Sequence, residues 1–283
     1  MTMRTAISHG KKSNNPLKQK KTMKKYIFMA VAGMLALSSC SNDDNDVQNT
    51  QNAPRQMTFT AGFGDDGLTR ASLNGSTKEV SFDAGDEISI LSANNNNVTF
   101  TTTAGGASAT FTGTATAGDP TYYAVYPYTA GLTLSGTTIS GVKIPMSQNA
   151  AATLTCGWDP AAPIAYATTT GTSLQFHNAC ALLKINNDGG LAHEIEVSCN
   201  EALTGTFSLD TSSGTLSSGS TKKFARAEAV PSGKTIYIAI APGEKTNFTV
   251  NWMGEYDYKT KHKTSAVTFV AGKIYDLGNT SEW

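Results

Sequence analysis

The feature that most constrains the fold is a repeated alternation of apolar and polar residues after residue 56. Apolar side chains occupy every second position in the segments 57–63, 194–197, 235–240 and 248–252. Such a period of two gives a strand one apolar face and one polar face, which is typical of half-buried antiparallel strands. The period of an amphipathic helix does not appear after residue 56. The chain is therefore predicted to be all-β.

Clusters of turn-forming residues separate these segments, at positions 64–67, 94–97, 186–190, 212–214 and 231–234. Short strands at this spacing suggest β-sandwiches, and about fifteen strands exceed what one sandwich holds. Residues 167–173 contain no large apolar side chain. We therefore predict a first β-sandwich domain at residues 56–172 and a second at residues 173–283.

The N-terminal segment has the pattern of a secretory signal. Met23, Lys24 and Lys25 form a basic head, and residues 26–37 carry no charge. Twelve residues at about 1.5 Å each reach about 18 Å, too short for a hydrocarbon core of about 30 Å. We therefore predict a signal peptide at residues 1–39, with Met23 as the true start.

The first cysteine, Cys40, lies at the end of this segment. The sequence from Leu37 to Cys40 resembles the bacterial lipobox, whose cysteine is acylated, and we expect lipidation of Cys40. The alternative is an ordinary signal peptide with a chance cysteine. Residues 40–55 have almost no large aliphatic side chains, which predicts a flexible tether. Their acidic run resembles the surface-export signal of lipoproteins from Bacteroidetes-type bacteria, or it is simply a solvated linker.

The formal net charge of zero changes once the signal is removed. Eight of the 22 basic residues, and none of the 22 acidic residues, lie within residues 1–39. The processed chain would carry 14 basic and 22 acidic residues, a net charge of −8. Nucleic acid, whose phosphates attract basic surfaces, is therefore not an expected partner. Such a charge suits an exported surface protein.

Three cysteines remain after Cys40: Cys156, Cys180 and Cys199. An odd number does not define a disulfide framework, so buried small apolar residues are the favoured interpretation. A bridge between Cys180 and Cys199 is the alternative.

No catalytic motif stands out in the sequence. His177, His193 and His262 lie on separate elements without a partner at ligand spacing, so no metal site is predicted. The acids of "DAGDE" at residues 83–87 imitate a calcium loop but fit a turn before a strand more simply. No serine lies in a G-x-S-x-G elbow. The chain is accordingly expected to be no enzyme and to need no cofactor.

The densest aromatic run is "YYAVYPY" at residues 122–128. Tyr122, Tyr126 and Tyr128 fall on one face of a predicted strand, where they could stack on sugar rings. A core strand with its hydroxyl groups at the rim is the favoured interpretation.

Seven motifs occur in a characteristic order behind the lipobox: "MTFTAGFGDDGLTRASL", "VSFDAGDEISIL", "SATFTG", "YYAVYPY", "KIPMSQ", "LQFHNACALLKI" and "GKIYDLG". This ordered set resembles the fimbrillin family, the lipoprotein pilins that build type V pili. The resemblance covers residues 23–278.

The resemblance implies two β-sandwich domains of transthyretin-like topology and a mode of assembly. A family member is exported to the outer membrane as a lipoprotein, and an arginine-specific protease then cuts after its first strand. The lipidated strand leaves, and the groove that it vacates accepts a strand from another pilin subunit. The mature protein belongs to a cell-surface fimbrium that serves cell adhesion.

In this chain the cut would fall between Arg70 and Ala71. It would release Cys40 together with the displaced strand, whose apolar residues are Met57, Phe59, Ala61 and Phe63. A cut at Arg55 would remove only the tether. The alternative for Arg70 is an ordinary arginine in a solvated loop.

The position in the fibre stays open at this stage. The last expected strand, at residues 272–278, leaves only residues 279–283 as a segment to donate. Either that strand detaches, or the protein is a tip or accessory pilin that accepts without donating. The rival function is a surface lipoprotein that keeps its lipid and binds glycans without polymerising. A host glycan or protein ligand is compatible with both.

Overall fold

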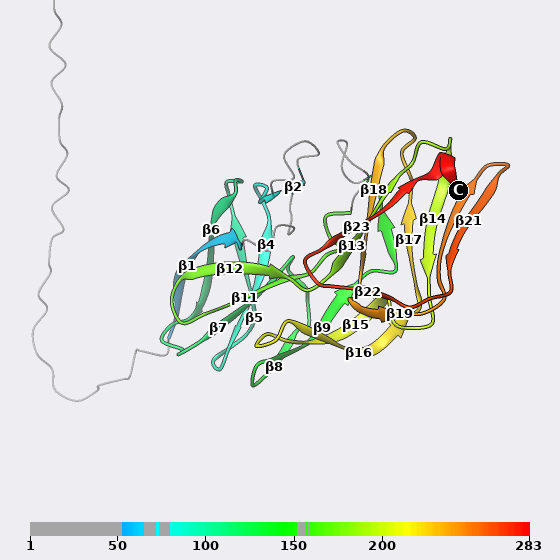
Figure 1. Ribbon diagram of the computed structural model, residues 1–283. Coiled ribbons are helices and arrows are strands. Elements are labelled where there is room, and N and C mark those ends of the chain that lie inside the picture. The colour runs from blue at the N-terminus through cyan, green and yellow to red at the C-terminus, as the bar shows by residue number, and fades with distance from the viewer. Residues whose placement is uncertain (1–52, 65–71, 74–79, 152–156, 158) are drawn as a thin grey trace, which may run out of the picture. The chain divides into compact units, whose positions relative to one another are not determined.

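The structure is a computed structural model, and it describes residues 53–64, 72–73, 80–151, 157 and 159–283. The predicted signal peptide, Cys40, Cys156, Arg70 and Ala71 lie outside these residues. Within them the chain forms 23 strands and one short 3-10 turn, η2 (Thr280–Glu282), with no α-helix (Figure 1). The prediction of an all-β chain is confirmed. No helix in the described ranges has the length and apolarity needed to cross a membrane.

Seven strands form a hydrogen-bonded ladder that closes on itself, which we call the barrel. In ladder order they are β1 (Pro54–Phe63), β12 (Ser173–Asn178), β11 (Ala165–Thr169), β7 (Tyr122–Tyr126), β4 (Glu87–Ser92), β5 (Asn95–Thr102) and β6 (Ser108–Thr116). Closure leaves no strand of this ladder with a free edge along its whole length.

The other strands form several smaller sheets, which we call the C-terminal sheets. One has the order β10 (Ser147–Asn149), β17 (Phe224–Glu228), β14 (Ala192–Ser198), β20 (Phe248–Gly254), β21 (Tyr258–Lys263). A second has the order β18 (Thr235–Ile240), β13 (Ala181–Asn186), β23 (Ile274–Asn279). A third has the order β16 (Thr215–Lys222), β15 (Thr204–Asp210), β9 (Thr138–Ile144), β8 (Thr133–Ser135). Two short pairs are β19 (Gly243–Lys245) with β22 (Val267–Phe269), and β2 (Ser72–Leu73) with β3 (Val80–Ser81).

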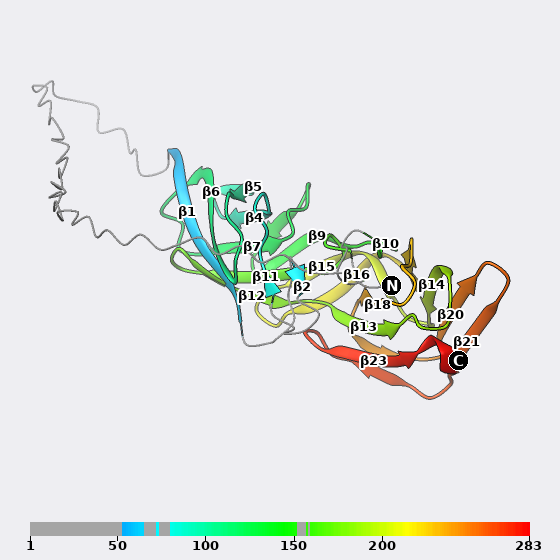
Figure 2. The same ribbon diagram turned by 90° about the horizontal axis from the view of Figure 1, so that it is seen from above.

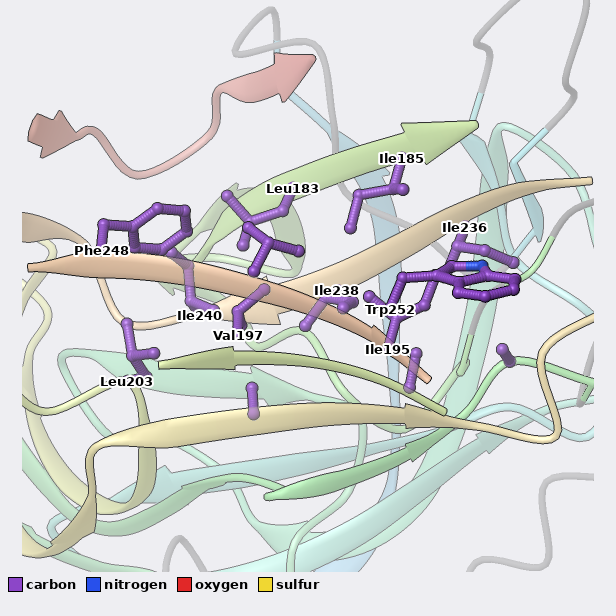
Figure 3. Close-up of a cluster of buried hydrophobic side chains, with 14 of the residues drawn as sticks. Leu183, Ile185, Ile195, Val197, Leu203, Ile236, Ile238, Ile240, Phe248 and Trp252 are labelled. Carbon is purple, nitrogen blue, oxygen red and sulfur yellow. The ribbon is translucent and has the colours of Figure 1, made fainter. Parts of the chain in front are cut away.

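The buried side chains form three clusters. The cluster inside the barrel is rich in phenylalanine and tyrosine. The cluster of the C-terminal sheets is mainly aliphatic, and Figure 3 shows Leu183, Ile238 and Val197 among its members. A third cluster joins β7 to β9, β13, β15 and β18. The predicted half-buried alternation is confirmed for residues 194–197 and 248–252, which lie in β14 and β20 with one buried face. It is wrong for residues 235–240, because β18 is buried on both faces: Ile236, Ile238 and Ile240 pack in the cluster of the C-terminal sheets, and Tyr237 and Ala239 pack in the third cluster.

Hydrogen-bonded ladders run across the predicted division between residues 172 and 173. β12 follows that division and pairs with β1 and β11, which precede it. β9 and β10 precede it and pair with β15 and β17, which follow it. The division into two domains stays a prediction. The predicted tether reached residue 55, yet Pro54 and Arg55 already pair with β6.

The predicted turn at residues 94–97 was too long. The chain turns at Ala93 and Asn94, and Asn95 already begins β5. The Asn95 side chain is buried, its Nδ2 donates to the Thr116 carbonyl at 2.8 Å, and its Oδ1 accepts from the Thr116 amide at 2.7 Å. The amide group thus imitates a backbone partner, which residue type and spacing do not reveal.

Both described cysteines are buried and free, so Cys180 and Cys199 form no disulfide. Burial raises the pKa of the Cys180 thiol to about 12. Burial also raises the pKa of Cys199. The interpretation as small buried apolar residues holds for these two.

Candidate functional site: the first strand of the barrel

The first strand, β1, lies between β6 and β12 in the closed ladder. It pairs antiparallel with β6 at nine positions, from Pro54 opposite Thr116 to Gly62 opposite Ser108. It pairs parallel with β12 at four positions, from Thr60 opposite Ser173 to Phe63 opposite Phe176. Figure 2 shows β1, in blue, beside β6 and reaching β12 at its far end. Removing β1 would therefore open the ladder along two edges.

The inward face of β1 carries the four apolar residues that define the predicted displaced strand. Phe59 and Ala61 are fully buried, with 0% of their surface exposed. Met57 and Phe63 are partly buried and pack against the same cluster. The outward residues Thr58 and Thr60 are exposed, so the burial follows the alternation in the sequence.

Aromatic contacts hold this face in place. The Phe59 ring meets the rings of Phe100 and Tyr122 edge to face, with centroids 5.3 and 5.4 Å apart. The Phe63 ring stacks on that of Phe82, with centroids 4.4 Å apart. Each such pair adds about 0.5–1.5 kcal/mol beyond the area that it buries. β1 is thus anchored to β5, β7 and the segment before β4.

Gly113 of β6 lies directly opposite Met57. A Cβ atom at this position would fall 2.7 Å from the Phe100 ring and 2.7 Å from the Thr99 carbonyl. Only glycine lets β6 pass this close to the aromatic ring that Phe59 touches.

The two neighbours of β1 depend on it unequally. β6 also pairs with β5 at Thr101 and Thr102. β12 pairs with β11 only at its last two residues, His177 and Asn178. Among the described strands, β1 is therefore the only ladder partner of residues 173–176. Loss of β1 would leave these four residues of β12 without a strand on either side.

The exit of β1 leads towards the predicted processing site. The amide of Gly64 donates to the Phe176 carbonyl at 3.0 Å, which ends the pairing with β12. Residues 65–71 follow, and the predicted cleavage at Arg70 and Ala71 lies outside the described residues.

The tyrosine run and the acidic turn that the sequence offered as candidate sites both contribute to the fold. Tyr122 and Tyr126 are buried, which confirms the core interpretation for these two, and Tyr128 follows β7 and is half-buried. The three rings therefore form no exposed stacking face. "DAGDE" forms a turn before β4, in which the Asp86 carboxylate accepts from the Asp83 amide at 2.8 Å and the Tyr126 hydroxyl at 3.0 Å. No group of three or more potential metal ligands occurs among the residues that the structure describes.

One surface was missed in the sequence. Leu191, Trp252 and Tyr256 line an open pocket together with two acidic residues and two glycines. Its only sequence signals are the pair Gly189-Gly190 and the turn "GEYDY" at residues 254–258.

Several solved structures from Bacteroides align with most of this chain. A candidate cell adhesion protein from Bacteroides uniformis ATCC 8492 aligns with 79% of this chain and 92% of its own, at 17% identity and a TM-score of 0.49. A candidate cell adhesion protein from Bacteroides ovatus ATCC 8483 aligns with 80% of this chain and 92% of its own, at 13% identity and a TM-score of 0.47.

A fimbrial protein from the same strain aligns with 79% of this chain but only 49% of its own, at 11% identity and a TM-score of 0.38. No protein-family model matches the sequence, and no curated protein matches it either.

Proposed function

We propose that this protein is a fimbrial subunit, or a tip or accessory pilin, that serves cell adhesion. It is exported as a lipoprotein acylated at Cys40 and held at the outer membrane. Cleavage between Arg70 and Ala71 then releases β1, and a strand from another pilin subunit fills the vacated groove. The role is structural rather than catalytic.

One observation carries this proposal: β1 is the first described strand of the chain, and it is bonded on both sides within a closed ladder. A strand in the interior of the sequence could not leave after a single cut. β1 can leave, because one cut after it separates it from the rest of the barrel. The groove left behind has an apolar floor formed by Phe100, Tyr122 and Phe82.

The closed state and the open state differ in their tendency to associate. While β1 is present, every strand of the barrel is paired, and the barrel offers no unpaired edge along its full length. Once β1 leaves, β6 and β12 expose unpaired backbone groups beside buried aromatic side chains. Such an edge favours the addition of an extended segment from another chain. Cleavage would thus convert a subunit that does not associate into one that can accept a strand from another subunit.

The direct test is the pair of variants Arg70→Ala and Arg55→Ala, produced in cells that process the protein. We expect the mature N-terminus, determined by mass spectrometry, to be Ala71 in the wild type and in Arg55→Ala. Arg70→Ala should retain acylated Cys40 and form no polymers. Normal maturation and polymerisation of Arg70→Ala would refute the proposed cleavage site. Retention of the lipid by the wild type, with glycan binding and no polymer, would favour the rival function.

A peptide tests the strand-addition step separately. A synthetic peptide of residues 53–64 should compete for the groove and stop polymerisation of the processed subunit. The same peptide with Phe59→Ala should compete much less, because it lacks the ring that contacts Phe100 and Tyr122. Equal inhibition by both peptides would show that the groove is not the assembly site.

A further inference from the structure

The C-terminal sheets carry an open pocket of about 310 Å³ that the assembly of a fimbrium does not require. It lies where β14 begins and where the turn between β20 and β21 projects. Its lining residues are Gly189, Gly190, Leu191, Trp252, Glu255, Tyr256 and Asp257. The volume falls at the lower end of the range for small-molecule sites, about 300–1,000 Å³.

Exposed apolar side chains gather at this pocket. Only four large apolar side chains are strongly exposed among the described residues, and two of them, Tyr256 at 91% and Leu191 at 67%, line it. A third, Tyr258 at 63%, is adjacent in sequence to Asp257 but does not line the pocket. Exposed apolar side chains that gather beside a pocket mark an interaction surface more often than a single exposed residue does. The Tyr256 ring is therefore available to contact a ligand.

The wall opposite the turn is held rigidly. The Asp188 carboxylate accepts from the Ser281 amide at 2.9 Å and the Ser281 hydroxyl at 2.7 Å, and these bonds lower its pKa. The Gly189 amide donates to the Thr280 hydroxyl at 2.8 Å. The Trp252 indole donates to Asn187 at 2.8 Å. Such bonds fix the loop before a ligand arrives, which lowers the entropic cost of binding.

Glycines bring the backbone directly onto the indole. A Cβ atom at Gly254 would lie 2.6 Å from the Trp252 ring and 3.1 Å from the Leu191 carbonyl. Gly190 has a φ of +122°, and its Cβ would lie 3.9 Å from the same ring. A side chain at Gly254 would displace the Trp252 ring, which lines the pocket, and a side chain at Gly190 would be strained by its positive φ. The position of the indole in the pocket therefore depends on Gly254.

The charged side chains at and beside the pocket indicate the net charge of the ligand. The carboxylates of Glu255 and Asp257 form no hydrogen bond or ion pair with any other described residue, so they are free to accept from hydroxyl groups. They would repel an anionic ligand. The ammonium group of Lys259 does not line the pocket, but it lies 5.2 Å from the ring centroid of Trp252, which does, and it donates to the Thr280 carbonyl at 3.0 Å. A cationic ligand at the indole would be repelled by this ammonium group. A neutral ligand with one apolar face and several hydroxyl groups satisfies all of these groups.

We propose that this pocket binds a neutral sugar residue, with Tyr256 against the apolar face of the ring and the carboxylates of Glu255 and Asp257 accepting from its hydroxyl groups. A single hexose has about twelve non-hydrogen atoms, for which the usual binding efficiency of drug-sized ligands gives a dissociation constant of about 1–10 mM. The pocket residues lie in β20 and in loops beside β14 and β21, which belong to a different sheet from β1, so the test is independent of strand removal.

The probes are neutral methyl hexosides, methyl glucuronide and tetramethylammonium. Their binding to the purified protein is followed by saturation-transfer NMR and by tryptophan fluorescence. At least one methyl hexoside should bind at about 1–10 mM. Tyr256→Ala should raise its dissociation constant about tenfold or more, while Tyr258→Ala, the matched exposed tyrosine outside the pocket, should leave it unchanged. Glu255→Gln with Asp257→Asn should weaken hexoside binding and reduce the discrimination against methyl glucuronide.

Three results would each overturn the proposal. They are the absence of binding by every neutral hexoside, binding that Tyr256→Ala leaves unchanged, and binding of tetramethylammonium in preference to the hexosides. None of these pocket variants should change polymerisation of the processed subunit, so the failure of this proposal and the failure of the proposed function can be told apart.

Discussion

The barrel and the C-terminal sheets bury their apolar surface in different ways. The barrel cluster contains seven buried aromatic side chains: Phe59, Phe82, Phe100, Phe111, Tyr122, Tyr126 and Phe176. The cluster of the C-terminal sheets has three, Phe248, Trp252 and Phe269, among many isoleucines, leucines and valines. An aromatic core is built from a few large rings. Each strand that contributes a ring therefore supplies a large part of the buried apolar surface.

This difference shows where each region can be opened. β1 contributes Phe59 and Phe63 to the barrel and is the first described strand in the chain. In the C-terminal sheets the aliphatic core is centred on β13 and β18, which pair with each other at six positions and are interior to the sequence. One cut can remove a major part of the barrel core, whereas no single cut frees a central strand of the C-terminal sheets.

The largest expected effect comes from Phe59→Ala. Truncating a fully buried phenylalanine should lower the free energy of unfolding by about 3–5 kcal/mol. Because β1 is the only described ladder partner of residues 173–176, amide hydrogen exchange should accelerate there. Chemical denaturation and exchange measured by mass spectrometry provide the two readouts.

Phe248→Ala is the matched variant in the C-terminal sheets, where its ring lies 5.1 Å from that of Phe269. It should destabilise the protein by a similar amount but leave exchange at residues 173–176 unchanged. Equal acceleration at these residues in both variants would show that β1 does not control β12 separately.

A smaller effect is expected from Ala61→Leu. Ala61 is fully buried opposite Ala109 of β6, and a larger side chain there should cost about 1–3 kcal/mol through overpacking. The outward neighbour Thr60 is exposed, so Thr60→Val should stay within about 0.5 kcal/mol of the wild type. Denaturant midpoints distinguish the two variants. A neutral result for Ala61→Leu would mean that β1 has room to shift in the barrel.

Period-two alternation predicted both the strand class and the buried face of β1, because side-chain direction in a strand depends only on odd and even position. It could not predict that β12 would close the ladder beside β1, since residues 60 and 173 pair through tertiary contacts. Residues 167–173, where the domain division was predicted because they lack large apolar side chains, include the end of β11 and the connection to β12 in the same barrel ladder. The pocket at Tyr256 went unseen because exposure is a property of the folded surface.

The sequence also left the tyrosine run ambiguous. Tyr122, Ala124 and Tyr126 are all buried, and Tyr122 meets the Phe59 ring. Composition favoured a core strand but left a binding platform open. The packing decides for the core strand, because Tyr122 meets Phe59 of β1 and Tyr126 meets Phe82 and Phe176.

A pH effect should reveal the burial of the Cys180 thiol. The pKa of Cys180 is raised to about 12, above the value of about 8.5 for an unfolded chain, because burial disfavours the thiolate. The stability that Cys180 contributes is complete below pH 8.5 and is lost as pH rises towards 12. The decline of unfolding free energy over this range should be shallower in Cys180→Ala than in the wild type. An unchanged slope, or rapid alkylation of native Cys180, would contradict its sealed environment.

The smallest effect should come from the ion pair that links β13 to β23. Lys184 Nζ lies 2.6 Å from Asp276 Oδ2, and the side chains are 29% and 51% exposed, so water screens the pair. Asp276→Asn should cost at most about 1 kcal/mol, and added salt should shrink the difference from the wild type. The hydrogen bond to Asp276 raises the pKa of Lys184, so its contribution is present at neutral pH and is lost above the unfolded lysine value of about 10.4. Chemical denaturation of the wild type and of Asp276→Asn at low and high salt measures the cost of the substitution and its salt dependence. The same measurement above about pH 10 tests the pH dependence. A loss as large as that of Phe59→Ala would mean that β23 depends on one exposed charge as strongly as β1 depends on its aromatic anchor, and the contrast between the barrel and the C-terminal sheets would then fail.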